Sequence, residues 1–281
     1  TGFFRLSPRR RQSHIRQIWR IAYPCGIHFM ISQIIGYIAL WLITRSGGGM
    51  DVYYEQVVLL TGLTGILSMI PCLWFYSRDR IARKHGGLVL PQKPWKLDLP
   101  EMLLLLGMGA AFSQYTNMFV GMLQSVLNYQ EYQETMDQMT SGKSMWFLII
   151  CMGIIAPLAE EIVFRWLIYL RLRDYMRIGF AMVISGMIFG IYHGNLVQAV
   201  YAGILGMVFA DFLEISGCLW SSVLLHMGAN IWSLVSPDLV NWMLQKNPMY
   251  ILIMLFALIL ILVYGFLYFR ARAKGRTKRV L

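Results

Sequence analysis

Three apolar stretches of this 281-residue chain contain side chains that could carry out acid–base chemistry. In chain order, these residues are Glu160, Glu161, Arg165, His193, His226 and Asn230. If the stretches are membrane spans, as composition indicates below, an ionised side chain within one costs at least ~2.5 kcal/mol. Each of these residues therefore needs either a partner or a function.

Helical spacing gives the two acidic residues different expected roles. Glu161 and Arg165 are four positions apart, so they can form an ion pair on one face of a helix. Glu160 is rotated by about 100° from Glu161 and is left without that partner. A low dielectric disfavours its ionised form, so it is well placed to take up a proton as a general base.

The histidines and the asparagine complete a hydrolytic set. We expect Glu160 to take a proton from water, while His193 orients that water or shuttles the proton. His226 and Asn230 are four positions apart on one face, where two donors could stabilise a tetrahedral oxyanion. Ser221 and Ser222 lie one turn before His226 and could supply a nucleophile instead, but helix packing accounts for such small polar residues equally simply.

A catalytic zinc is the competing interpretation. Glu160, His193 and His226 could bind zinc and leave one coordination position open. However, the chain contains no H-E-x-x-H motif, so we expect no cofactor. The four cysteines lie in or beside apolar stretches without paired spacing, which predicts buried structural thiols; they are Cys25, Cys72, Cys151 and Cys218.

Composition indicates that the bilayer surrounds almost the whole chain. Hydrophobic residues make up 57% and charged residues 14%, and the mean hydropathy is +0.55, so no sizeable soluble domain is expected. The prediction is one all-α membrane domain over 1–281, a polytopic helical bundle with an intramembrane catalytic cavity. About eight spans are expected, at 21–44, 57–76, 101–126, 146–170, 178–193, 196–215, 218–235 and 249–269.

The basic residues predict the orientation of these spans. With eight spans and a cytoplasmic N-terminus, 22 of the 25 Lys and Arg residues fall in cytoplasmic segments. The other three, Arg45, Lys143 and Lys246, fall in outside loops. Both the basic tail at 1–20 and the C-terminal tail are therefore expected in the cytoplasm. The net charge of +11 fits contact with anionic lipids, and no nucleic-acid motif accompanies it.

Two loop regions are expected from turn-forming residues. Ser77 to Pro100 is rich in Gly and Pro and is predicted to be a cytoplasmic loop. The fifth and sixth spans are short, with Gly194 and Asn195 forming the turn between them. A turn at membrane depth requires a protein-lined or wet cavity, which is expected beside His193.

Taken together, the motifs resemble a known family signature. Glu160-Glu161-x-x-x-Arg165, Phe189-x-x-x-His193 and His226-x-x-x-Asn230 are similar to the signature of the CPBP family, the CAAX-protease and bacteriocin-processing (Abi) intramembrane proteases. The similarity covers about 146–235. It leaves the first three spans and their loops at 21–145, and the last span and tail at 236–281, unassigned.

The resemblance implies an intramembrane endopeptidase that acts on a membrane-embedded peptide or protein. Members of the family are usually regarded as glutamate-dependent, which implies catalysis without a metal ion. It implies catalysis by Glu160, His193, His226 and Asn230, with Glu161, Arg165 and Phe189 as supporting motif residues. The implied cavity opens towards the cytoplasm. The expected spans also place Glu160 and His226 in the cytoplasmic half of the bilayer, so we expect cleavage on that side of the substrate's membrane segment, near its carboxyl end if the CAAX-like mode holds. The compact chain resembles bacterial members of the family, which implies a location in the bacterial plasma membrane.

Two other function classes remain open from the sequence. Some relatives act without proteolysis, as membrane scaffolds or immunity proteins that regulate a partner membrane protein, although their motifs tend to be degraded. A proton-coupled transporter could also use an intramembrane Glu and His. The intact motifs favour the enzyme, and no inverted repeat is visible in the sequence.

Overall fold

The computed structural model describes residues 13–85, 95–123 and 129–277, and within these ranges every regular element is helical. The elements are α1 (His14–Arg45), α2 (Met50–His85), α3 (Leu99–Met122), α5 (Tyr129–Thr140), α6 (Met145–Leu148), η3 (Ile149–Ile155), α7 (Ala156–Glu161), η4 (Ile162–Tyr169), α8 (Leu170–Arg173), α9 (Ile178–Tyr192), α10 (Leu196–Ser216), α11 (Leu219–Lys246) and α12 (Met249–Thr277). The labels η3 and η4 denote π-helical segments.

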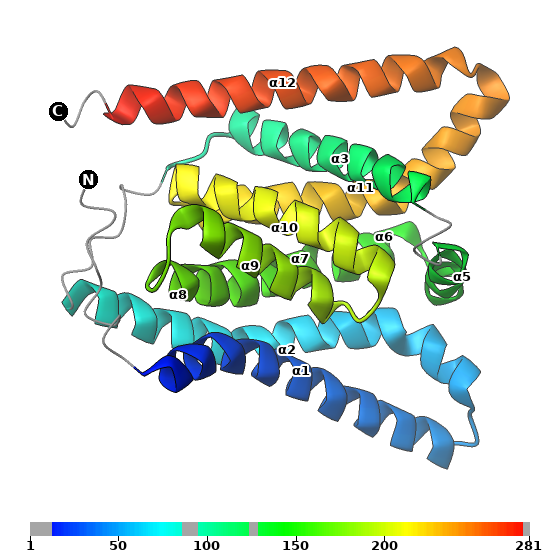
Figure 1. Cartoon of the computed structure of the whole chain (residues 1–281). Coiled ribbons are helices and arrows are strands. Elements are labelled where there is room, and N and C mark those ends of the chain that lie inside the picture. The colour runs from blue at the N-terminus through cyan, green and yellow to red at the C-terminus, as the bar shows by residue number, and fades with distance from the viewer. Residues whose placement is uncertain (1–12, 86–94, 124–128, 278–281) are drawn as a thin grey trace.

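The predicted polytopic helical bundle is confirmed. Six helices in the described part of the chain are long and apolar enough to cross a membrane: α1, α2, α3, the continuous helix Met145–Arg173, α10 and α12. The other two expected spans correspond to α9, which is shorter, and α11. Figure 1 shows that the chain reverses direction between successive long helices. The first residues of α1 and the last residues of α12 therefore lie on the same side of the bundle.

Several boundaries differ from those expected. Residues 77–85, predicted as loop, continue α2, and α11 extends beyond 235 to Lys246 with Pro237 inside it. The amphipathic helix α5 occupies a segment that was expected to be a loop. The predicted end of the third span at 126 lies outside the described residues. The same is true of seven of the basic residues assigned to cytoplasmic segments: Arg5, Arg9, Arg10, Arg11, Lys93, Lys278 and Arg279.

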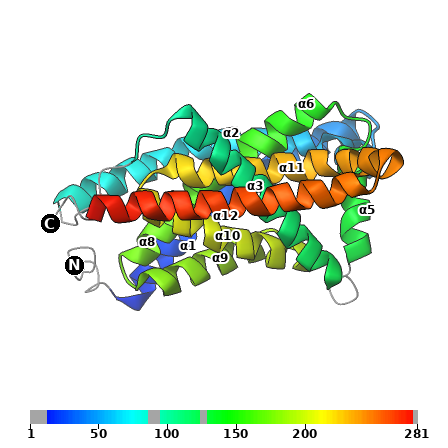
Figure 2. The ribbon, with the colours of Figure 1, turned by 90° about the horizontal axis from the view of Figure 1, so that it is seen from above.

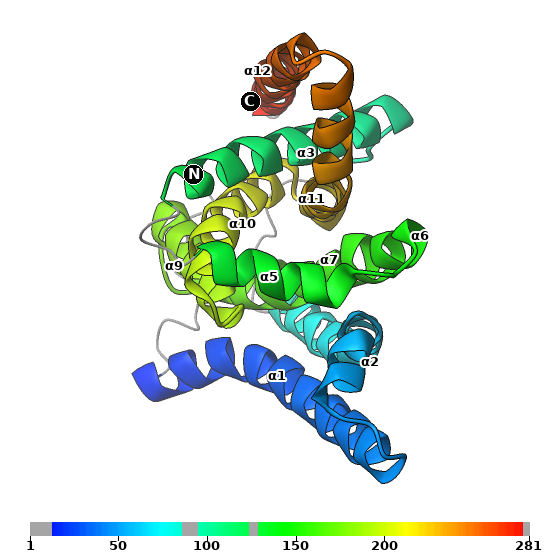
Figure 3. The ribbon, with the colours of Figure 1, turned by 90° about the vertical axis from the view of Figure 1, so that its right-hand side faces the viewer.

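The helices form a layered arrangement with the catalytic-motif helices inside. Figure 3 shows α1 and α2 at one edge and α12 at the opposite edge, with α7, α10 and α11 between them. Seen from above, α12 lies across α3, α10 and α11 (Figure 2). Helix α1 is the most peripheral of the long helices, and its buried residues are Pro24 and His28. The residues of the three motifs are thereby enclosed by neighbouring helices.

The turn between α9 and α10 forms as expected. Gly194 has a φ of +75°, and the Asn195 side chain caps α10 by accepting a 2.8 Å hydrogen bond from the backbone N–H of Gln198. Preceding glycines allow close packing of the two helices, because the space for a Cβ at Gly186 or Gly190 is occupied by backbone of α10. This packing places His193, which follows the last residue of α9, against the interior of the bundle.

One end of the bundle is held by buried ion pairs. Arg171 of α8 donates to Asp79 of α2 at 2.6 Å and to the backbone carbonyl of Arg20 in α1 at 2.5 Å. Arg20 also pairs with Asp174 at 2.8 Å. These contacts join three helices whose basic residues were expected to share one side of the membrane. At the same end, Arg173 pairs with Glu214 of α10 at 3.1 Å.

Candidate functional site

The acidic pair lies in an unusual part of the fourth long helix. Glu160 and Glu161 end the short segment α7, which is flanked by the π-helical segments η3 and η4. A π-helix is rare, usually short, and frequent at functional sites. Its wider turns change which residues share a face, so side chains in this region do not follow a simple 3.6-residue pattern. Sequence periodicity did not predict this feature.

Glu161 contacts Arg165 on its own helix and His226 on α11. The spacing predicted an ion pair with Arg165, and one is present, with 3.1 Å between Glu161 Oε1 and a guanidinium nitrogen. The same Oε1 atom is 3.0 Å from Nδ1 of His226 in α11. A carboxylate oxygen only accepts, so Nδ1–H of His226 is the donor. Glu161 therefore connects two helices as well as two turns of its own helix.

His226 lies between the two carboxylates. While Nδ1 faces Glu161, Nε2 is 3.5 Å from Oε2 of Glu160. Glu160, which was expected to be an unpaired carboxylate, therefore has a neighbouring side chain in His226. The reason is tertiary: α11 packs against α7 and brings His226, 65 positions from Glu161, against the acidic pair. Both ring nitrogens of His226 face carboxylates, and its expected role as an oxyanion donor stays a prediction.

Arg165 is completely buried, and aromatic rings enclose its charge. Its guanidinium carbon lies 4.2 Å from the ring centre of Phe189 and 5.2 Å from that of Phe209, distances typical of cation–π contacts. Gly206 of α10 leaves room for it, since a Cβ there would be 2.8 Å from a guanidinium nitrogen. The charge of Arg165 is thus balanced by Glu161 and shielded by two aromatic side chains.

Phe189 links the two histidines. Its ring centre is 4.9 Å from that of His193 and 5.5 Å from that of His226, in both cases edge to face. The Phe189 backbone carbonyl accepts a 2.8 Å hydrogen bond from Nδ1 of His193. That bond directs the proton of neutral His193 to Nδ1, which leaves Nε2 as an acceptor.

Asn230 and the two serines have other partners. Asn230 Nδ2 donates to the Met152 carbonyl at 2.9 Å, which uses one of the two N–H groups of the amide. Ser222 bonds to the Leu219 carbonyl at 3.0 Å, and Ser221 to the Cys218 carbonyl at 2.6 Å. The serine hydroxyls are thus used in helix packing, in agreement with the simpler interpretation.

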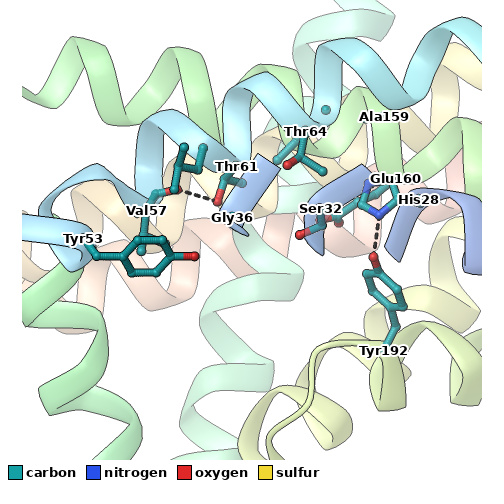
Figure 4. Close-up of a pocket in the computed structure, with 13 residues that line it drawn as sticks. His28, Ser32, Gly36, Tyr53, Val57, Thr61, Thr64, Ala159, Glu160 and Tyr192 are labelled. Carbon is teal, nitrogen blue, oxygen red and sulfur yellow. Dashed lines mark hydrogen bonds between the residues drawn. The ribbon is translucent and has the colours of Figure 1, made fainter. Parts of the chain in front are cut away.

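A cavity of about 220 Å³ reaches Glu160 from the side of α1 and α2. Its other walls are formed by His28, Ser32 and Gly36 of α1, a face of α2 running from Tyr53 to Gly65, and Tyr192 of α9. In Figure 4, Glu160, His28 and Tyr192 lie at one end of the cavity and Tyr53 at the other. His193, His226 and Asn230 are not among the lining residues.

The cavity extends along the first two helices. From His28 it follows α1 as far as Gly36 and α2 back to Tyr53, which is towards the α1–α2 connection and away from the ion pairs of Arg20 and Arg171. The first two helices, which lie outside the motif region, therefore form most of its wall. The opening towards the cytoplasm that the resemblance implied stays a prediction.

Two wall residues were not found by the sequence analysis. His28 of α1 is 7% exposed, and its Nδ1 lies 2.5 Å from the Tyr192 hydroxyl. A histidine within the first apolar span was a visible signal, but nothing in its spacing connected it with α9. Tyr192 directly precedes His193 and was attributed only to the apolar span.

No ready metal site is formed by the residues that the zinc interpretation named. Across 13–85, 95–123 and 129–277, no three His, Cys, Asp or Glu side chains are grouped so that they could hold a metal ion. Glu160 and His226 are neighbours, with Nε2 of His226 facing Glu160 and Nδ1 facing Glu161. The four cysteines are free thiols, either buried or half-buried.

Comparison with known proteins agrees with the motifs. Residues 142–232 match the model of a family described as "Type II CAAX prenyl endopeptidase Rce1-like". The chain is 26% identical over 227 residues to the Bacillus subtilis (strain 168) protein named "Putative membrane peptidase YdiL", an alignment that covers 78% of this chain and 88% of the relative. No solved structure matches at comparable significance. The matched region contains all seven motif residues, and the two matches support membership of this chain in the CPBP family.

Proposed function

We propose that this protein is an intramembrane endopeptidase in which Glu160 activates water to hydrolyse a peptide bond of a membrane-embedded protein or peptide. The observation that carries the proposal is the arrangement of His226 between Glu160 and Glu161, with Glu160 at the wall of a cavity. The family match and the peptidase relative support a membrane protease. The reaction type is peptide hydrolysis by a carboxylate base.

Charge balance favours one additional proton in this site. Glu160 and Glu161 carry two potential negative charges and Arg165 one positive charge, so one additional proton makes the enclosed group neutral. Burying an unbalanced charge is costly. Glu160 and His226 are the two groups between which that proton can be shared. With the proton on His226, Glu160 is ionised and can act as a base.

The reaction then follows from the remaining groups. Water attacks the scissile carbonyl carbon as Glu160 takes one of its protons, and this proton passes to the amide nitrogen as the C–N bond breaks. His193 does not line the cavity, and we assign its Nε2 acceptor to the attacking water only in the substrate-bound enzyme. Asn230 has a second N–H, suited to the oxyanion. Glu161 is a positioning residue, since it orients the ring of His226.

The activity can be tested without knowing the substrate. The membrane peptidome of cells with the wild-type protein is compared with that of cells carrying Glu160→Gln, which conserves shape but removes the base. The matched control is Glu134→Gln, an exposed carboxylate of α5. We expect product peptides with the wild type and the control but not with Glu160→Gln. Identical peptidomes in all three would contradict the proposal and favour a non-proteolytic scaffold.

The arginine-rich end is proposed to face the cytoplasm, which follows from the positive-inside rule. The described basic side chains at the ends of α1, α2 and α8 gather there, as their shared ion pairs indicate, and Arg272 of α12 pairs with Glu101 at the start of α3. Both termini would then be cytoplasmic in a cell membrane, with anionic lipid at that surface. Labelling of single cysteines introduced at Arg45 and at Arg16 from outside the cell tests this, with labelling expected at position 45 alone.

A further inference from the structure

The cavity beside Glu160 is bounded by residues of α1, α2, α7 and α9 and measures about 220 Å³. A substrate segment that lies against these helices can place a side chain, or a short extended piece of backbone, inside it.

Unpaired hydroxyl groups make the cavity suitable for a polar group. Thr64 is 6% exposed and Ser32 is half-buried, and both line the cavity. Neither hydroxyl forms a hydrogen bond with any residue of the described ranges. Neither oxygen is one of the fully buried unpaired side-chain atoms of the described ranges, so both hydroxyls are accessible from the cavity, where a ligand that supplies donors and acceptors can bind them.

Gly36 and Tyr53 control the size of the cavity at its far end. A Cβ on Gly36 would lie 2.9 Å from the Tyr53 hydroxyl oxygen. Any larger residue at position 36 therefore has to move the Tyr53 side chain. This atom is the far end of a flexible side chain, so the movement should alter the cavity more than the fold.

We propose that this cavity is the subsite for a small polar side chain of the substrate, such as Ser, Thr or Asn, next to the cleaved bond. Thr64 and Ser32 bind the polar group, while Gly36 and Tyr53 limit its size. The inference rests on the proposed function, because Glu160 at the wall places the occupant of the cavity next to the activated water. These specificity-determining residues belong to α1 and α2, outside the region 142–232 of the family match.

The test uses full-length protein in nanodiscs and a library of single-span peptides randomised at their central positions. Cleavage products are sequenced to obtain the preference next to the cut. We expect Gly36→Ala to reduce cleavage after the larger accepted side chains by about tenfold relative to Ser. Gly36→Ala combined with Tyr53→Phe should restore the wild-type size preference, since the clashing hydroxyl is gone. Thr64→Val should reduce the preference for polar over apolar side chains.

The control is Gly26→Ala, on the same helix with no atom within 4 Å of the added Cβ; it should leave the preference unchanged. If the protein cleaves the library but Gly36→Ala and Thr64→Val keep the wild-type preference, the inference is wrong while the proposed function stands.

A binding measurement separates the two proposals. The same peptides, carrying a small diazirine side chain at the central position, are photo-crosslinked to the Glu160→Gln variant, and the attachment sites are mapped. Attachment within 28–36 of α1 and 53–64 of α2 supports the subsite even if the library is not cleaved. Absence of cleavage would count against the proposed function alone. Attachment confined to other helices, or none at all, would overturn the subsite.

Discussion

A single carboxylate oxygen, Oε1 of Glu161, lies 3.0 Å from Nδ1 of His226 and 3.1 Å from the guanidinium of Arg165. The first contact orients a histidine on another helix, and the second balances charge. We expect Glu161→Gln to lower kcat by about 10-fold to 100-fold with little change in KM, because the variant loses the charge that holds Nδ1–H. Steady-state kinetics separate this result from a purely structural role, which would reduce the amount of folded protein and leave kcat per folded molecule intact.

Arg165 should contribute mainly to stability. Replacing it with Met leaves Glu161 buried without its cation, which costs about 3 to 5 kcal/mol. Arg165→Lys should be intermediate, because it keeps the charge but not the planar contact with Phe189 and Phe209. Thermal unfolding in detergent measures both, with the exposed Lys246→Ala as the control. An unfolding temperature of Arg165→Met equal to that of the control would show that the pair does not stabilise the fold.

Variants of Phe189 and Phe209 can separate the contributions of His193 and His226 to kcat. Phe189 contacts the rings of both His193 and His226, whereas Phe209 stacks on His226 at 4.8 Å. Both rings also cover Arg165. If His193 must be held in place, Phe189→Leu should lower kcat several-fold more than Phe209→Leu at similar losses of stability. Equal losses of kcat would indicate that the Phe189–His193 contact has no part in the reaction.

The proposed mechanism uses no metal ion, so activity should survive chelation. Purified protein is treated exhaustively with a chelator, and product formation and zinc content are then measured on the same sample. We expect substoichiometric zinc and unchanged turnover. Zinc bound one to one, lost together with activity and restored with it, would instead favour the metalloprotease interpretation based on Glu160, His193 and His226.

The helices were predictable because apolar length and turn residues are local signals. The α9–α10 turn at Gly194 and Asn195 is an example, since a positive φ and a side-chain cap depend on those two residues alone. The ion pair of Glu161 with Arg165 was likewise predictable from spacing. The position of Glu160 beside His226 was not, because it depends on how α11 packs against α7. The cavity wall from α1 and α2 also depends on packing, and no motif marks those helices.

The depth of Glu160 predicts where the substrate is cut. Arg171 belongs to the ion-pair cluster at one end of the bundle, and Glu160 precedes it by eleven residues, which is at most about 16 Å of helix because the π-helical segment η4 rises less per residue than an α-helix. Half of a ~30 Å hydrocarbon core is about 15 Å. With the ion-pair cluster at the cytoplasmic boundary, as proposed, Glu160 lies deep in the cytoplasmic half of the bilayer, in line with the expected cut on that side. We therefore expect product termini in the inner part of the cytoplasmic half of the substrate's membrane segment. Inserting four leucines between the cytoplasmic boundary and the cut should move the cut four residues towards that boundary along the substrate sequence, because the depth of the site is constant. Mass spectrometry of the products from the original and lengthened substrates measures this shift, and cuts within one helical turn of either membrane surface would show that the assigned depth is wrong.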